Sequence, residues 1–96
     1  MIFEINKEIV FSTAHVSADT GALLNDDKLE ELAMINDGFS HRILVPSPRE
    51  LGGLSIRGEI PSELVDLLWL AVGQDCKWLL LDVDGPVLEE LISYDW

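Results

Sequence analysis

Basic residues are scarce in this chain, and their scarcity limits what the protein can bind. Six lysine and arginine residues stand against 18 aspartate and glutamate residues, so the formal net charge is −12 over 96 residues. Proteins that contact nucleic acid or anionic membranes directly need Lys and Arg to neutralise phosphate groups. The sequence therefore argues against direct binding to nucleic acid or a membrane, and a basic protein is the partner that we expect.

Cysteine and long apolar runs are also scarce. Cys76 is the single cysteine, which excludes an internal disulfide, and no cationic-then-apolar leader opens the chain, so we expect a cytoplasmic setting. No apolar run reaches the roughly 18 residues that a membrane-spanning helix needs. His15, His41 and Cys76 lack the close spacing of zinc ligands, and we expect neither a metal nor a cofactor.

Apolar residues, by contrast, are plentiful. They make up 48% of the chain, which is enough for a folded core despite the mutual repulsion of the acidic side chains. The chain shows no internal repeat, low-complexity segment or linker, and its length fits one small domain. We therefore place a single domain at residues 1–96.

The densest apolar run lies between Cys76 and Gly85 and predicts a central strand covered on both faces. Alternating apolar residues predict two further strands, one within residues 2–11 and one within residues 39–45. In the first of these strands, Lys7 stands at a position where the alternation calls for an apolar residue. Either that strand begins properly after Lys7, or the chain bends there and only residues 9–13 pair deeply.

Helices are predicted in two places. Ser17 and Asp27 both resemble helix caps, so we expect two short helices or one kinked helix between the first two strands. The clearest helix runs from Pro61 to Gly73, with apolar residues at helical spacing. Residues 47–60 carry three glycines and no sustained period, which predicts a long connection with a brief extended piece at Leu54 to Arg57.

These elements predict an α/β fold, with a two-layer α+β arrangement as the alternative. Their order is strand, helix or helix pair, strand, long loop, helix, strand and short tail. We expect a small three-stranded sheet. The third strand should be central, because the first two alternate while the third is apolar throughout.

The predicted central strand ends in Asp82-Val83-Asp84-Gly85. This pattern resembles the first motif of haloacid-dehalogenase-type phosphatases, and the resemblance implies a nucleophile at Asp82, an acid/base at Asp84 and a bridging magnesium ion. Pro86 replaces the usual Thr, and eleven residues after Gly85 leave no room for the later lysine and carboxylates. We therefore expect no enzyme and no catalytic residue; the alternative is a small magnesium-dependent phosphatase-like site.

Three further side chains have plain structural interpretations. His15, which follows Ser12-Thr13-Ala14, has no sign of a completed catalytic triad, and we interpret it as a satisfied turn histidine. Cys76 stands beside Asp75, which discourages thiolate formation, so we expect a buried small side chain. Trp69 widens the apolar arc of the 61–73 helix; it either packs in the fold or makes a protein interface.

The acidic residues are spread over every segment, so folding must create a charged surface. One explanation is solubility. The other is a decoy, in which rigidly spaced carboxylates imitate phosphates and occupy the Lys/Arg cleft of a nucleic-acid-binding protein. The partner-binding residues that we predict are Asp82, Asp84, Glu89, Glu90, Asp95 and Trp69.

Several short motifs together resemble a family of short acidic domain-of-unknown-function proteins from bacterial plasmids, phages and other mobile elements. The motifs are Ser-Thr-Ala-His at 12–15, a strand ending in Val45-Pro46, Cys76-Lys77-Trp78 before Asp82, and a terminal Tyr94-Asp95-Trp96. Helix-prone residues precede that terminus, where the resemblance implies a looser loop. It also implies a setting in which small acidic proteins inhibit host restriction or CRISPR machinery.

We accordingly expect a non-enzymatic acidic interaction protein. It would be an inhibitor or nucleic-acid mimic that docks on a basic nucleic-acid-binding protein, as an anti-CRISPR or anti-restriction factor does. A structural homo-oligomeric module, using a surface at Trp69 or Trp96, is a further alternative. The sequence leaves both a monomer and a homodimer open.

Overall fold

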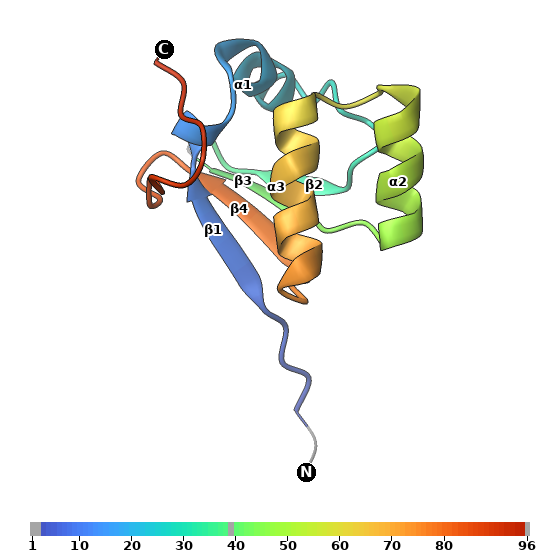
Figure 1. Ribbon diagram of the computed structural model, residues 1–96. Coiled ribbons are helices and arrows are strands. Elements are labelled where there is room, and N and C mark those ends of the chain that lie inside the picture. Colours follow the sequence, from blue (N-terminus) through green and yellow to red (C-terminus); the bar gives the residue numbers. More distant parts are fainter. Residues whose placement is uncertain (1–2, 39, 96) are drawn as a thin grey trace.

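The computed structural model describes residues 3–38 and 40–95, and within them four strands form one mixed sheet (Figure 1). The strands are β1 (Glu8–Ser12), β2 (Met34–Asn36), β3 (Ser40–Leu44) and β4 (Trp78–Asp82). Their order across the sheet is β1-β4-β3-β2; β4 runs parallel to β1 and antiparallel to β3. The expected α/β fold is confirmed, but the sheet has four strands rather than three.

The apolar run identified β4 correctly as a strand between β1 and β3. The missed strand is β2, three residues that the helical spacing had assigned to a second helix. Asp27, the expected cap of that helix, adopts a left-handed φ of 54° and turns the chain instead. The following residues then pair with β3, with Ile35 opposite Arg42, because an available sheet edge can outweigh local helix preference.

The same described residues also form three α-helices and one short turn of 3₁₀-helix. Helix α1 (Ala18–Asn25) begins at Ser17, whose Oγ accepts a hydrogen bond from the Thr20 N–H at 3.2 Å. Helix α3 (Ser62–Gly73) lies where the sequence predicted it. The 3₁₀ turn η1 (Thr13–His15) directly follows β1.

Helix α2 (Pro48–Arg57) occupies most of the segment expected to be a long loop, so that prediction was wrong. Ser47 caps it by accepting a hydrogen bond from the Glu50 N–H at 3.2 Å, and Gly58 ends it at a φ of 67°. Its own residues Leu51 and Leu54 are buried in the core. The caps and this burial offset the helix cost of the two internal glycines, roughly 1 kcal/mol each.

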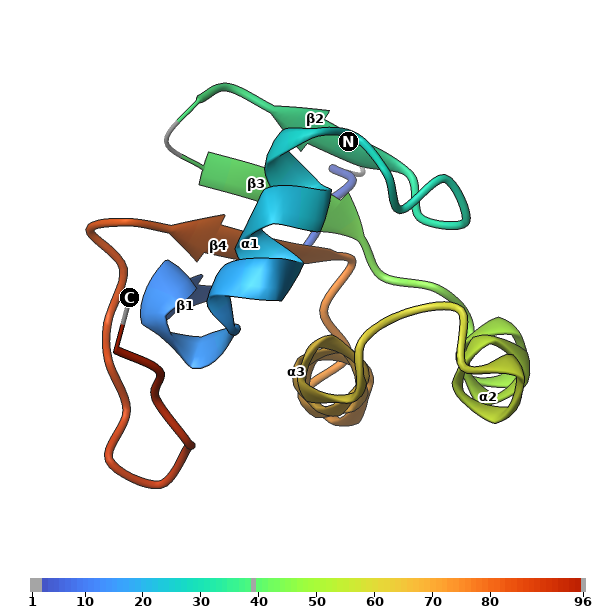
Figure 2. The same ribbon diagram turned by 90° about the horizontal axis from the view of Figure 1, so that it is seen from above.

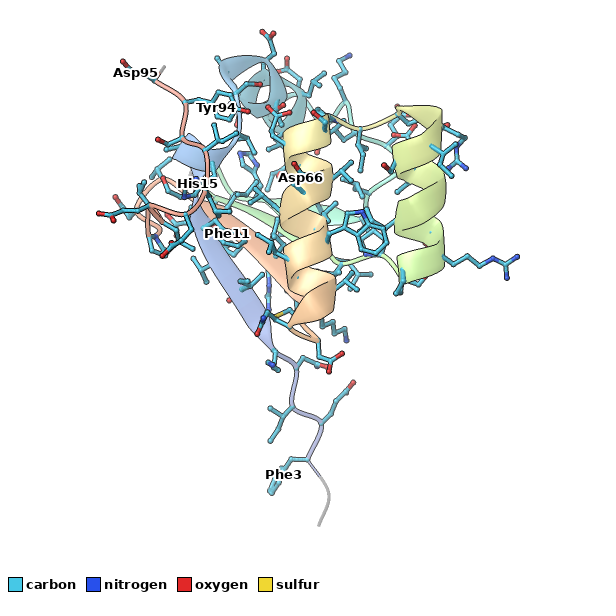
Figure 3. All side chains as sticks on the ribbon, viewed as in Figure 1. Phe3, Phe11, His15, Asp66, Tyr94 and Asp95 are labelled. Atoms are coloured by element: carbon cyan, nitrogen blue, oxygen red, sulfur yellow. The ribbon has the colours of Figure 1, made fainter. Side chains whose placement is uncertain are left out.

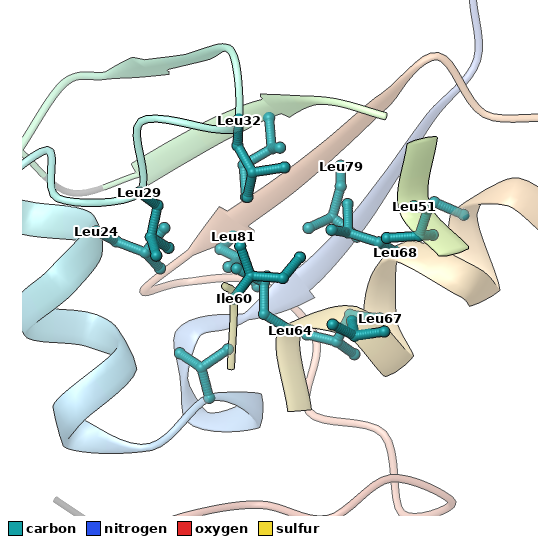
Figure 4. Packing of buried hydrophobic residues seen from close by; sticks show 14 of the residues in the cluster. Leu24, Leu29, Leu32, Leu51, Ile60, Leu64, Leu67, Leu68, Leu79 and Leu81 are labelled. Atoms are coloured by element: carbon teal, nitrogen blue, oxygen red, sulfur yellow. The ribbon is translucent and has the colours of Figure 1, made fainter. Parts of the chain in front are cut away.

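The helices α2 and α3 lie on the same side of the sheet, so the fold has two layers (Figures 1 and 2). Leu79 and Leu81 of β4 are fully buried and meet Leu64 and Leu68 of α3 in the core (Figure 4). Burial alternates along β4, with Trp78 only partly buried. The expectation that this strand is covered on both faces was therefore wrong; one face lacks a helix layer in the described part of the chain.

The first and last described segments, residues 3–7 and 86–95, lie outside the helix layer. Residues 3–7 extend away from the sheet (Figure 1), and Phe3 and Ile5 are 72% and 84% exposed. The strand thus begins after Lys7, which was one of the two alternatives. Residues 86–95 form an irregular tail without a helix, despite their helix-like spacing. Phe39 and Trp96, which figured in two predictions, lie outside the described residues.

Helices long and apolar enough to span a membrane are absent from residues 3–38 and 40–95.

Candidate functional site

The Asp82–Gly85 motif forms a tight turn at the end of β4. The Asp84 N–H donates to Oδ1 of Asp82 at 2.9 Å, and the Gly85 N–H donates to the Asp82 carbonyl at 3.0 Å. A Cβ added to Gly85 would lie 2.6 Å from the carbonyl oxygen of Phe11. Asp82 therefore has a structural role as the acceptor that closes the turn, and Gly85 is needed because a side chain there would clash with the backbone of Phe11.

The surroundings of this turn are acidic. Asp82 and Asp84 line an open hollow of about 550 Å³ with Asp37, Ser40 and Val83, and its lining contains no Lys or Arg. Phosphoryl transfer relies on positive groups that neutralise the charge developing on the phosphate. Among the described residues, no three His, Cys, Asp or Glu side chains are arranged to hold a metal ion. The carboxylates around this turn attract cationic groups.

His15 anchors the tail beside this turn. Its ring is buried, Nδ1 lies 2.8 Å from the Ile92 carbonyl oxygen, and Nε2 accepts from the Leu88 N–H at 3.0 Å. A carbonyl can only accept and an amide can only donate, so the ring is neutral with its proton on Nδ1. His15 is thus a hydrogen-bonded structural histidine, as the sequence analysis expected.

Backbone contacts reinforce this attachment. The Ser12 N–H donates to the Pro86 carbonyl at 2.9 Å, and the Tyr94 N–H donates to the Ala14 carbonyl at 2.7 Å. The tail is therefore held at both ends, against the last residue of β1 and against η1. Figure 3 shows His15, Tyr94 and Asp95 gathered where the tail returns to the fold.

A second hollow of about 350 Å³ separates the tail from the start of α3. Glu63 and Asp66 line it from the helix, Glu90 and Tyr94 line it from the tail, and His15 also lines it. The lining again contains no Lys or Arg. The carboxylates of Glu63 and Asp66 from α3 and of Glu90 from the tail therefore line the same hollow, although the two segments lie far apart in the sequence.

Glu63 is held in place by α1. Its Oε2 accepts a hydrogen bond from the Ser17 N–H at 3.0 Å. Partial burial acts to raise the pKa of Glu63, but hydrogen bonds from Ser17, from the Glu63 backbone and from Thr20 together outweigh it, and the pKa lies below its ordinary value. This carboxylate is therefore kept ionised and fixed at the start of α3.

His41, the other histidine, is a buried residue of β3 and pairs with Asn36 of β2. Its Nδ1 lies 2.7 Å from Oδ1 of Asn36, whose amide donates to Oδ1 of Asp27 at 2.6 Å. Burial lowers the pKa of His41, and the nearby charges of Asp37 and Asp27 only partly oppose this effect. The ring is a neutral part of the fold.

Cys76 is partly buried rather than fully buried. It packs against the core, and its Sγ lies 3.8 Å from the Gln74 carbonyl oxygen.

The predicted carboxylates belong to the turn after β4 and to the tail that follows it, two segments that lie at the same end of the molecule (Figure 1). Asp82 and Asp84 line the first hollow, Glu90 lines the second, and Glu89 and Asp95 are exposed on the tail. Residues 78–96 contain no Lys or Arg. We call this surface the acidic pole; its members are Asp37, Glu63, Asp66, Asp82, Asp84, Glu89, Glu90 and Asp95.

Sequence reasoning missed three members of the acidic pole. Asp37 precedes β3, whereas Glu63 and Asp66 lie in the first turns of α3. Only the pairing of β3 with β4 and the return of the tail past α3 bring them to this end. Trp69 is 40% exposed farther along α3 and lines neither hollow.

A second surface was missed altogether, because β4 was expected to be covered on both faces. Val10, Leu80, Arg42 and Ile35 form one row across the four strands, and Trp78 pairs with Leu44 in the next row. We call the surface formed by these six residues and Glu8 the open face. A strand with one exposed face usually alternates apolar and polar residues. Residues 78–81 are all apolar, so the sequence of β4 gives no sign that every second side chain is less buried.

Arg42 is paired within the open face. Its Nε lies 2.9 Å from the Glu8 carboxylate, and its guanidinium carbon lies 4.6 Å from the centre of the Trp78 ring. A hollow of about 490 Å³ lined by Leu80 and Arg42 continues to Asp82. The open face and the acidic pole therefore adjoin.

Comparison with known proteins identifies a family over nearly the whole chain. Residues 8–96, from the first residue of β1 onward, match the C-terminal domain of a family of unknown function, DUF5983. No curated protein and no solved structure gives a significant match. The chain belongs to the DUF5983 C-terminal domain family.

Proposed function

We propose that the protein is a non-enzymatic inhibitor that docks its acidic pole on a basic nucleic-acid-binding protein. The observation that carries this proposal is the composition of the two hollows of the pole. Neither lining contains Lys or Arg, and six carboxylates line the two hollows: Asp37, Asp82 and Asp84 the first, and Glu63, Asp66 and Glu90 the second. Such a surface attracts a Lys/Arg-rich cleft over long range.

The pole is also preorganised. The turn fixes Asp82, Ser17 fixes Glu63, and the two hydrogen bonds of His15 hold the tail that carries Glu89 and Glu90. Charges that are already ordered lose less entropy on binding than charges on a flexible tail. This favours docking over simple solubility as the role of the acidic residues.

The kind of partner follows from the charge. A rigid array of carboxylates competes with phosphates for the same basic cleft, so the proposed effect is to block nucleic-acid binding by the partner. The resemblance to proteins of mobile elements suggests a CRISPR or restriction component in a bacterial cytoplasm. Binding to nucleic acid itself or to a membrane is not part of the proposal.

Two variants with equal charge changes test this proposal. The first neutralises the pole at exposed positions, Asp84→Asn with Glu89→Gln and Glu90→Gln. The second is the matched control off the pole, Glu4→Gln with Glu30→Gln and Glu31→Gln. Each immobilised protein is incubated with lysate of the native host, captured proteins are identified by mass spectrometry, and each one is purified.

The expected partner is a basic protein whose affinity falls at least about tenfold between 50 and 300 mM salt. Its affinity should also fall at least about tenfold for the pole variant and remain within about twofold for the control. The wild-type protein should displace nucleic acid from it. Binding that is insensitive to salt, equal for both variants, or without effect on nucleic-acid binding contradicts the proposal.

A further inference from the structure

The open face exposes several apolar side chains, although the protein as a whole is strongly charged. Ile35 and Leu44 are 58% and 37% exposed, and Val10, Leu80 and Trp78 are partly exposed beside them. The strand pairing places these residues on neighbouring strands in two adjacent rows. Val10, Leu80, Trp78 and Leu44 adjoin one another, and Arg42 separates this group from Ile35. An exposed group of apolar side chains on a sheet face is typical of a binding site.

The charged residues within and beside the open face indicate which kind of ligand fits it. Arg42 is already neutralised by Glu8 and stacked on Trp78, so it offers little to an acidic partner. The hollow that begins at Leu80 continues to Asp82, a member of the acidic pole. A suitable ligand therefore has apolar groups for the middle of the face and positive groups for its end.

A second copy of the chain fits this requirement poorly. Each copy carries a net charge of −12, and face-to-face packing would bring a second Glu8 and a second Asp82 to the same interface. Like charges placed together at an interface oppose association. Charge complementarity thus favours a basic partner over self-association.

We infer that the open face binds a segment of a basic protein in which aliphatic or aromatic side chains alternate with Lys or Arg. The apolar side chains would pack on Leu80, Val10 and Trp78, while the cations reach Asp82 and Asp84. This inference rests on the proposed function and adds an apolar contact to it. The partner is then recognised by a mixed apolar and basic segment, rather than by positive charge alone.

Two synthetic 12-residue peptides serve as probes. One alternates leucine with lysine, and the other alternates serine with lysine, so both carry the same charge. Binding is followed by ¹H–¹⁵N NMR at 150 mM salt through the Trp78 indole and the Leu80 amide. The variants are Leu80→Ala on the open face and Leu70→Ala on α3, which removes an exposed leucine elsewhere.

The leucine–lysine peptide should bind at least about tenfold more tightly than the serine–lysine peptide and shift the Trp78 and Leu80 signals. Leu80→Ala should weaken it about tenfold, whereas Leu70→Ala should leave it within about twofold. Spectra of the free variants check that both retain the native fold.

Three results would overturn the inference. If both peptides bind equally and Leu80→Ala has no effect, charge alone is recognised, and the proposed function survives without the apolar contact. If neither peptide binds, both proposals fail. If the Trp78 and Leu80 signals shift with protein concentration before any peptide is added, the open face is occupied by a second copy.

Discussion

The side chain of His15 joins the backbone of Leu88 across 73 positions of the chain, through a 3.0 Å hydrogen bond from the Leu88 N–H to Nε2. The opposite ring nitrogen bonds the Ile92 carbonyl oxygen. One buried ring thus fixes the path of the segment that carries Glu89 and Glu90. His15 therefore holds the middle of the tail, while backbone hydrogen bonds at Pro86 and Tyr94 hold its two ends.

Replacing His15 should release the tail. His15→Ala removes two hydrogen bonds and leaves a cavity, so we expect a loss of about 2–4 kcal/mol in unfolding free energy. The Leu88 amide should also exchange with solvent at least tenfold faster than in the wild type. Denaturant titration and hydrogen exchange measure these effects.

Ile92→Ala is the matched control for that prediction, because only the backbone carbonyl of Ile92 bonds His15 and its side chain is exposed. It should leave exchange at Leu88 unchanged. Slow exchange at Leu88 in His15→Ala would show that the tail is held without the ring.

Gly85 should tolerate no side chain. In Gly85→Ala the new Cβ meets the backbone of Phe11 at 2.6 Å, and the turn must shift, at a cost of about 1–3 kcal/mol in unfolding free energy. Gly52→Ala is the contrast, because a Cβ there meets open space within α2. It should stabilise the protein by about 0.5–1 kcal/mol. A neutral Gly85→Ala in thermal unfolding would contradict the packing described for the turn.

Acidification should destabilise the fold through His41 and Glu63, whose pKa values are both lowered by folding. In each case the unfolded chain binds a proton more readily than the folded protein, so stability is lost as the pH falls. The His41 contribution is fully present above its ordinary value of 6.5 and is lost as the pH falls through the folded pKa. The Glu63 contribution is present above 4.5 and is lost below that, through its own folded pKa.

Urea titrations between pH 3 and 8 check this pH dependence. His41→Gln should flatten the decline just below pH 6.5, and Glu63→Gln should flatten only the decline below pH 4.5. Asp66→Asn, which leaves both hydrogen-bonded groups in place, should retain both declines. A constant unfolding free energy from pH 8 to pH 4 in the wild type would overturn the assignment.

The turn after β4 should lack phosphatase activity. Incubation with p-nitrophenyl phosphate and magnesium should release no phosphate above the buffer rate, because the hollow around Asp82 and Asp84 is lined by carboxylates and has no cationic side chain. Asp82→Asn should behave like the wild type. Magnesium-dependent release that Asp82→Asn abolishes would restore the enzyme alternative.

Strong local patterns predicted much of the fold. The apolar run at β4 revealed a central strand, alternation revealed β1 and β3, and helical spacing revealed α3. The failures fall where local preference and tertiary context disagree. Internal glycines concealed α2, although Ser47 and Pro48 form a standard helix start, and helical spacing concealed β2, whose conformation depends on pairing with β3.

The sequence by itself determined the sign and excess of the charge, the presence of a core and the position of β4, because these follow from composition and short-range periodicity. Only the tertiary structure decided that β4 keeps one face uncovered, that His15 pins the tail, and that Asp37 and Glu63 join the acidic pole. These features depend on which strands pair and where a distant segment returns. Such contacts join residues tens of positions apart, and no local pattern in the sequence encodes them.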